Sequence, residues 1–229
     1  TLNCLGMYIP WHRRLLTVED TAELQVYHDH WLRMETRRER PDGTPEVDMN
    51  DCLKSSLRMR PDRIIVGEVR GPEAATLLTA MNTGHDGSFG SLHANTAQET
   101  VTRMINPPMS VPPIMLTGLD LIIIQARLHV NGKTARKITE VAEIAGMEGS
   151  KPRLNTIWKY NASTDQIEET GIPSNLREVI CRAAGVTPDV FEKHVNQRQQ
   201  IIEDLIARDI TDIQSVTTVI QNFYAQSHH

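Results

Sequence analysis

The sequence predicts an α/β fold in which a parallel sheet is flanked by helices and followed by a β-hairpin extension and a helical C-terminal region. Two short apolar runs, at 15–18 and 64–67, have the composition of strands that are buried on both faces of a parallel sheet. Segments with helical spacing alternate with these runs, and this alternation is the signature of such a sheet. After residue 120 the pattern changes to a hairpin signal and finally to helices.

Apolar residues at helical spacing predict four helices in the first half of the chain, at 2–9, 49–60, 74–81 and 97–105. A proline or a glycine ends each of the first three, and Thr96 with Glu99 forms a capping box that opens the fourth. Residues 88–92 are expected to add a third short strand. The charged segment 33–46 contains proline and glycine, so we expect an exposed loop or ribbon there.

The second half of the chain predicts strand pairs followed by helices. Residues 121–130 and 133–144 have strand-like patterns, and the Asn131-Gly132 pair between them is the strongest short hairpin signal. Another pair, 154–160 and 167–170, surrounds a polar turn, and from residue 174 onward every pattern is helical. We therefore expect a core domain at 1–170 and a helical region at 171–229.

Composition excludes several classes of function. The net charge is −5 and the pI is about 6.0, so the chain lacks the general basic coat of a nucleic-acid-binding protein, and no direct nucleic-acid partner is expected. Aromatic residues make up 4% of the chain, too few for a surface that stacks the bases of a single strand. Three widely spaced cysteines without a CxxC pair indicate a reducing compartment, which favours the cytoplasm.

Acidic residues follow both buried strands of the predicted sheet. Glu19 and Asp20 come after the first apolar run, and Glu68 comes after the second. A single acid in this position is more often a helix cap or a loop charge, but two at comparable strand ends favour a site. Ligands of open parallel sheets bind beyond the carboxyl ends of the strands. Paired carboxylates there can hold a hard cation and orient a water molecule, as phosphoryl transfer requires.

Two histidines, His85 and His93, lie in a segment with glycines at 84, 87 and 90. Glycines allow the backbone to approach a bulky ligand closely, and a histidine there can contact a phosphate oxygen. The alternative is an ordinary hydrogen-bonded loop histidine, which the spacing by itself favours.

A cluster of arginines stands beside two acids: Arg33, Arg37, Arg38 and Arg40 beside Glu35 and Glu39. The common interpretation of such a cluster is a solvated, self-paired surface. The alternative is an arginine that reaches a nucleotide phosphate in a neighbouring subunit, because the guanidinium fork matches phosphate oxygens. The spacing does not decide between these interpretations.

Three segments resemble motifs of the traffic ATPases, the hexameric motors of type II and type IV secretion, type IV pili and archaella. Segment 17–24 (TVEDTAEL) resembles their acidic box, 60–71 (RPDRIIVGEVRG) their Walker B box, and 83–95 (TGHDGSFGSLHAN) their histidine box. The boxes occur in the family's order, and the similarity of the flanking sequence extends over about residues 1–145. The residues of these boxes are most similar to those of the Tad/CpaF-type and archaeal branches of the family.

The resemblance implies a RecA-like P-loop NTPase core that uses ATP and Mg²⁺. By this resemblance Glu68 activates the attacking water, and Glu19 and Asp20 lie near the metal and the water. Glu19 and Glu68 would contact Mg²⁺ only indirectly, and His93 would contact the terminal phosphate. The other residues that the resemblance implies as contacts to the nucleotide or its phosphates are Asp20, Arg37, Arg70 and His85.

One departure from the family pattern concerns the phosphate loop G-x-x-x-x-G-K-[ST], which the chain does not contain. The family places this loop just before a stretch that is similar to residues 1–5. We therefore expect a fragment that begins after the loop and is inactive by itself.

The parent protein is expected to be a hexameric ring that hydrolyses ATP to power secretion or the assembly of pilus-like filaments. It would dock peripherally on the cytoplasmic face of an inner-membrane platform protein. Two alternatives stay open: a DNA-transfer motor on the same fold and, for this chain, a non-hydrolytic docking or scaffold module.

Overall fold

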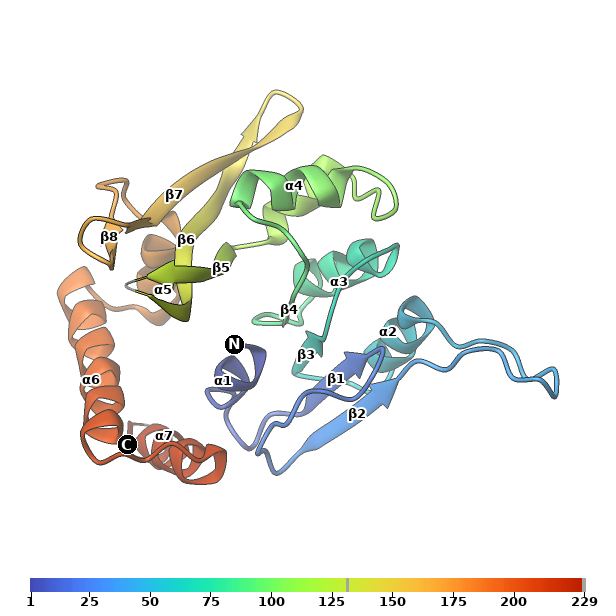
Figure 1. The fold of residues 1–229 in the computed structure, drawn as a ribbon, viewed down its shortest axis with the longest axis horizontal. Coiled ribbons are helices and arrows are strands. Elements are labelled where there is room, and N and C mark those ends of the chain that lie inside the picture. Colours follow the sequence, from blue (N-terminus) through green and yellow to red (C-terminus); the bar gives the residue numbers. More distant parts are fainter. Residues whose placement is uncertain (131, 228–229) are drawn as a thin grey trace. The chain divides into compact units, whose positions relative to one another are not determined.

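A computed structural model describes residues 1–130 and 132–227 (Figure 1). It confirms the predicted α/β class, because one sheet is parallel and flanked by helices and the other is an antiparallel sheet formed by successive strands. The chain divides into two compact units. The first comprises Thr1–Val69, Thr83–Ser91 and the chain from Val186, and the second comprises Arg70–Asn82 and Leu92–Gly185.

The parallel sheet lies in the first unit and has the strand order β2-β1-β3-β4. The central strand β1 (Leu15–Glu19) is buried along its whole length and pairs with β2 (Trp31–Glu35) and β3 (Arg63–Val66). The outer strand β4 (Phe89–Gly90) has only two residues, so it is shorter than the predicted 88–92. The two apolar runs are thus strands, as predicted.

Strand β2 was not predicted, and the expected loop at 33–46 was wrong over its first residues. Residues 31–35 form an edge strand whose side chains are exposed or half-buried, so they show no apolar run. The free backbone edge of β1 supplies their hydrogen-bond partners, and this tertiary pairing overrides the local pattern. The rest is the expected exposed ribbon: a bridge pairs Arg37 with Val47, and the segment reaches out beyond the sheet (Figure 1).

Four helices belong to the first unit: α1 (Leu2–Gly6), α2 (Met49–Leu57), α6 (Pro188–Ala207) and α7 (Ile213–Ser227). Helix α2 packs on β1 and β2, and a reciprocal capping box between Asp48 and Asp51 opens it. Helix α1 lies against the sheet through a core cluster: Ile9, Leu15, Leu24, Val26 and Ile65, with Leu2, Trp31 and Phe89 around it.

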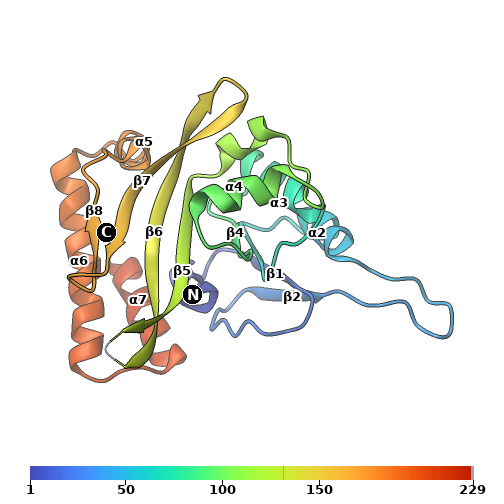
Figure 2. The same cartoon turned by 45° about the horizontal axis from the view of Figure 1, so that its top comes forward.

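The second unit contains an antiparallel sheet in the order β5-β6-β7-β8 (Figure 2). Its strands are β5 (Leu121–Val130), β6 (Lys133–Glu148), β7 (Lys151–Asn161) and β8 (Gln166–Glu169). They confirm both predicted strand pairs, although β6 is longer than 133–144. Asn131 of the predicted turn lies outside the described residues, and Gly132 has a φ of 74°, which suits a turn.

The helical elements of the second unit are α3 (Glu73–Asn82), α4 (Ala97–Ile105), the 3₁₀ helix η1 (Pro113–Gly118) and α5 (Asn175–Ala184). Carboxylates of β6 hold two of their amino termini. Glu140 accepts the N–H of Ala97 at 2.9 Å, and the buried Glu143 accepts the N–H of Asn175 at 2.8 Å and the Ser174 hydroxyl.

The elements after residue 171 are helices, as predicted, and the domain boundary at 170 stays a prediction. Among residues 1–130 and 132–227, the helices are too short or too polar to cross a bilayer.

Candidate functional site at the carboxyl edge of the parallel sheet

The carboxyl edge of the parallel sheet collects acidic residues from three strands. Glu19 ends β1 and stands in register with Glu35, which ends β2. Val18 of β1 pairs with Val66 of β3, and Asp20 and Glu68 each follow two residues later. The topology therefore brings Glu19, Asp20 and Glu68 to one edge, where open parallel sheets bind their ligands.

The backbone on both sides of Glu68 is held by hydrogen bonds. The N–H of Gly67 donates to the carbonyl of Val18 at 2.9 Å, and the hydroxyl of Ser91 donates to the carbonyl of Gly67 at 2.5 Å. The N–H of Val69 donates to the carbonyl of Ser91 at 2.7 Å. Glu68 itself is half-buried. A carboxylate is thus presented from a rigid backbone at the end of a central strand.

Gly67 leaves little room between β3 and the side chain of Glu19 at the end of β1. A Cβ atom at this position would lie 3.1 Å from Cγ of Glu19. A larger residue would therefore require the Glu19 side chain to shift by a few tenths of an ångström.

The carboxylate of Glu19 is already engaged within the protein. Glu19 is 2% exposed, and its Oε1 accepts the N–H groups of Glu23 at 2.8 Å and Leu24 at 2.7 Å. Its Oε2 lies 3.3 Å from Nε of Arg33. The Arg33 guanidinium also donates to the Leu24 carbonyl and stands 4.5 Å from the centre of the Trp31 ring. Glu19 therefore fixes the loop that follows β1.

Asp20, like Glu35, is an exposed acid of this edge. Its Oδ1 accepts the hydroxyl of Thr36 at 2.6 Å, which connects it to the residue after β2. Glu35 makes a second connection between the loop and β2, because its Oε1 accepts the N–H of Ala22 at 2.6 Å. The loop after β1 is thus tied to β2 from both directions.

The described residues do not form a complete magnesium site. Within residues 1–130 and 132–227, no three His, Cys, Asp or Glu side chains are placed to hold a metal ion. Oε1 of Glu19 accepts two backbone N–H groups, whereas Oε2 is buried without a hydrogen-bond partner among the described residues and lies 3.3 Å from Nε of Arg33. The positive charge of Arg33 beside this oxygen argues against a role as a direct Mg²⁺ ligand. Proteins usually bind Mg²⁺ through one or two carboxylates together with substrate phosphates.

His85 lies at the opposite edge of the sheet from Glu68. Its carbonyl accepts the hydroxyl of Ser88 at 2.7 Å, and that hydroxyl accepts the N–H of Ile64 at the start of β3 at 3.0 Å. Since β3 and β4 are parallel, the turn before β4 stands at the amino edge. The Nδ1 atom of His85 is buried without a hydrogen-bond partner among the described residues. The structure does not bring His85 together with the acids.

Arg37 stiffens the ribbon after β2. Its guanidinium donates to the carbonyl of Pro45 at 3.1 Å, while its backbone N–H and carbonyl bond to Val47 at 2.9 and 2.8 Å. It comes two residues after Glu35, so its chain position is next to the acidic edge.

Arg70 and His93 belong to the second unit. The backbone N–H groups of Arg70 and Gly71 donate to Oε1 of the buried Glu73 at 2.6 and 2.8 Å, so Glu73 closes the turn that leads into α3. His93 is exposed and comes three residues before Thr96, which caps α4.

Sequence reasoning missed three residues of these arrangements: Glu35, Glu73 and the role of Arg33 as the partner of Glu19. The rule that an acid after a strand marks the sheet edge would have found Glu35 if β2 had been recognised. Glu73 precedes an apolar helical stripe, so its position at the first turn of a helix was a usable signal.

Comparison with protein families finds one model, described as type II/IV secretion system protein, that matches residues 1–220. An uncharacterized protein of Methanocaldococcus jannaschii, MJ1287, is 32% identical over 89% of this chain and 76% of its own length. Another from that organism, MJ0781, is 25% identical over 97% of this chain. The conjugal transfer protein TrbB of Rhizobium radiobacter is 38% identical over 58% of this chain.

The chain spans 54% of MJ0781 and 39% of TrbB, so it corresponds to about half of these relatives or less. Among solved structures, the VirB11 ATPase of the Brucella suis type IV secretion system is 29% identical with a TM-score of 0.49, covering 62% of this chain and 44% of that one. The pilus retraction motor PilT is 32% identical with a TM-score of 0.39, covering 56% of this chain and 37% of that one.

Proposed function

Because the chain belongs to the type II/IV secretion system protein family, a family of secretion, pilus and conjugation ATPases, we propose that it is the motor domain of an ATPase. The parent protein hydrolyses ATP to power secretion or the assembly of type IV pilus-like filaments. One observation supports this function best. Hydrogen bonds fix the backbone around Glu68, and the strand register places this residue near Asp20 at the carboxyl edge of the parallel sheet.

Glu68 is proposed as the general base of the reaction. Hydrolysis needs a water molecule that is aligned with the terminal phosphate and loses a proton as it attacks. A half-buried carboxylate on a fixed backbone suits this task, because general-base catalysis depends on geometry before pKa. Asp20 is proposed to orient the water from the neighbouring strand, and Glu19 acts as the residue that holds this edge in shape.

The other proposed contacts come from the family resemblance. His93 contacts the terminal phosphate, and Arg37 and Arg70 contact phosphate groups of the nucleotide. His85 has the weakest support, since the amino edge of the sheet is far from Glu68 along the strands. The proposed cofactors are ATP and Mg²⁺.

The proposed assembly is a hexameric ring of the parent protein. It would work in the cytoplasm and dock on the inner face of the cell membrane through a platform protein. We assign the ATPase core to 1–170 and a helical region to 171–229.

The substitution Glu68→Gln in the full-length protein tests the proposed base. We expect ATP affinity to stay within a few-fold of the wild type and turnover to fall about 10²–10⁴-fold, because removal of a general base has this effect. Nucleotide titration and phosphate release are measured on each variant. Near-normal turnover of Glu68→Gln would show that another group is the base.

Two further variants make this experiment specific. Glu178→Gln applies the same change to an exposed glutamate of α5 and should leave both measurements unchanged. Glu19→Gln removes a buried acceptor and the ion pair with Arg33, so we expect a lower melting temperature rather than a selective loss of turnover.

A DNA-transfer motor is the second candidate, because conjugal transfer proteins are among the relatives. A non-hydrolytic scaffold is the third, and it would follow if the full-length protein neither bound nor hydrolysed ATP.

A further inference from the structure

A buried glutamine of the C-terminal helix contacts the backbone near the start of the chain. Gln221 of α7 is 6% exposed. Its Nε2 donates to the carbonyls of Met7 at 2.8 Å and Ile9 at 2.9 Å, and its Oε1 accepts the N–H of Trp11 at 3.2 Å. One side chain thus satisfies three backbone groups that lie more than 200 residues away in sequence.

The segment 7–11 depends on such a partner. It follows α1, which ends at Gly6 and whose last carbonyls accept the N–H groups of Met7, Tyr8 and Ile9. The carbonyls of Met7 and Ile9 lie beyond the helix, and Pro10 supplies no N–H group. A buried backbone group without a partner is destabilising. Gln221 therefore holds the chain just beyond α1 and sets its path toward β1.

Helix α1 in turn packs on the strands that carry the candidate site. A Cβ atom on Gly6 would lie 3.2 Å from Cγ1 of Val26, in the segment after β1, and 3.8 Å from Cδ1 of Ile65 in β3, so the helix backbone lies close to both. Ile9 packs in the same core cluster as Leu15 of β1. Since Ile65 precedes Glu68 by three residues, a shift of α1 acts on the strands that lead to the carboxyl edge.

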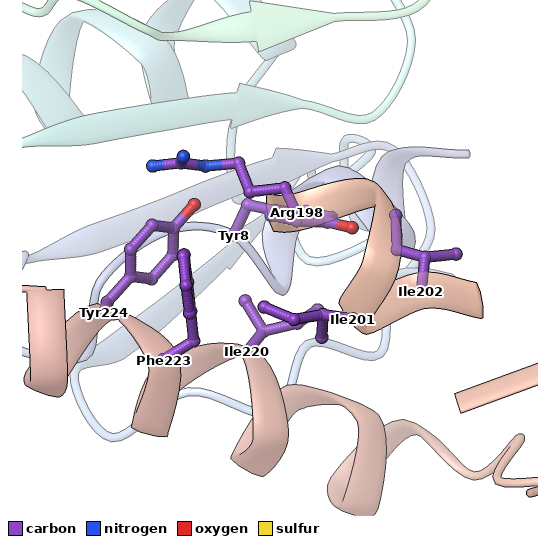
Figure 3. A pocket seen from close by; sticks show the side chains of 7 residues that line it. All are labelled: Tyr8, Arg198, Ile201, Ile202, Ile220, Phe223 and Tyr224. Carbon is purple, nitrogen blue, oxygen red and sulfur yellow. The ribbon is translucent and has the colours of Figure 1, made fainter. Parts of the chain in front are cut away.

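Contacts with α6 hold helix α7, which carries Gln221, in place. The guanidinium carbon of Arg198 on α6 stands 5.4 Å and 5.7 Å from the ring centres of Phe223 and Tyr224. Figure 3 shows these side chains beside Ile220 and Tyr8, which comes from the segment that Gln221 holds. Burial is the main cause that raises the pKa of the Tyr8 hydroxyl.

We propose that Gln221 is a positioning residue for the nucleotide site: through the segment 7–11 it fixes α1 against β1 and β3. The proposal rests on the ATPase function proposed above. Helix α1 packs close to Ile65 of β3, three residues before Glu68. A loosened α1 should therefore impair the activation of water more than it weakens the hold on the nucleotide.

The test compares Gln221→Met and Gln221→Glu in the full-length protein. Methionine keeps the length of the side chain and removes all three hydrogen bonds. Glutamate keeps the shape, but it replaces the donor by an oxygen that faces two carbonyls. Gln226→Met and Gln226→Glu are the matched controls on an exposed position of the same helix.

Two measurements are made, and the first needs no ATPase activity. Hydrogen exchange of the amides in 2–11 should accelerate about tenfold or more in both Gln221 variants, because buried backbone groups lose their partners. The glutamate variant should exchange at least as fast as the methionine variant, and the Gln226 controls should match the wild type. If Gln221 acted only by packing, the glutamate variant would behave like the wild type, and that result would overturn the proposal.

The second measurement is the steady-state rate of ATP hydrolysis. We expect kcat to fall about tenfold in Gln221→Met while KM for ATP stays within about twofold. An unchanged kcat in an active enzyme, or an effect confined to KM, would refute the positioning role and leave the ATPase function intact. A wild-type protein without ATPase activity would refute the proposed function, and with it this role, even if the exchange data confirmed that Gln221 holds the segment 7–11.

Discussion

At the scale of single residues, Asp62 ties the amino ends of β1 and β3 together. Its Oδ2 accepts the N–H of Arg14 at 2.7 Å, and its Oδ1 pairs with the guanidinium of Arg13 at 3.0 Å. The hydrogen bond from Arg14 is the main cause that holds the pKa of the Asp62 carboxyl below its usual value of 3.8. The folded state therefore favours the ionised form of this residue.

The Asp62 contact should make stability depend on pH. A depressed pKa stabilises the fold above 3.8, and this contribution disappears as the pH falls through the folded pKa. At pH 7, Asp62→Asn should lower the free energy of unfolding by about 1 kcal/mol, a modest value because the side chain is partly solvated. Urea unfolding at pH 7 and at steps down to pH 3 measures this. The difference between the two proteins should shrink at low pH, and a constant difference would contradict the role of ionisation.

At the scale of elements, α2 shows a complete local start signal. Oδ1 of Asp48 accepts the N–H of Asp51 at 2.7 Å, and Oδ2 of Asp51 accepts the N–H of Asp48 at 3.4 Å. This reciprocal arrangement satisfies backbone donors that the first helical turn leaves unpaired. The helix then buries Cys52 and Leu53 as it packs on β1 and β2.

Removal of this cap should weaken the fold by a predictable amount. We expect Asp48→Ala to lower the free energy of unfolding by about 1 kcal/mol and Asp48→Asn to have a smaller effect, since asparagine is a good N-cap. Chemical denaturation measures both. Glu46→Ala changes an exposed residue two positions earlier and serves as the control. Equal losses in Asp48→Ala and Glu46→Ala would show that the cap does not contribute.

At the scale of the whole molecule, the charge balance bears on the cargo of the proposed motor. The chain has 24 basic and 29 acidic side chains, so a duplex that approaches it meets no net attraction. We expect no binding of duplex DNA at micromolar protein concentration and about 150 mM salt, where non-specific affinities are about 10⁻⁴–10⁻⁶ M for basic proteins. Fluorescence anisotropy across a salt series tests this. Salt-dependent binding at low micromolar concentration would instead favour the DNA-transfer motor.

The sequence by itself determined the α/β class, the two buried strands of the parallel sheet and the acids that follow them. These features depend on local signals, such as an apolar run for β1 or a proline or glycine at a helix end, and they need no distant partner. The positions of Glu19, Asp20 and Glu68 at one edge then follow from strand direction, because parallel strands end on the same side.

Only the tertiary structure decided how those residues are used. Strand β2 forms because β1 offers it a backbone edge, and this strand brings Arg33 to the carboxylate of Glu19. His85 and Glu68 occupy opposite edges although they are close in sequence, because β4 runs parallel to β3. The contact of Gln221 with the segment 7–11 joins the two ends of the chain. Hydrogen bonds and ion pairs between distant residues leave no periodic signal in a sequence, since their geometry exists only after the chain has folded.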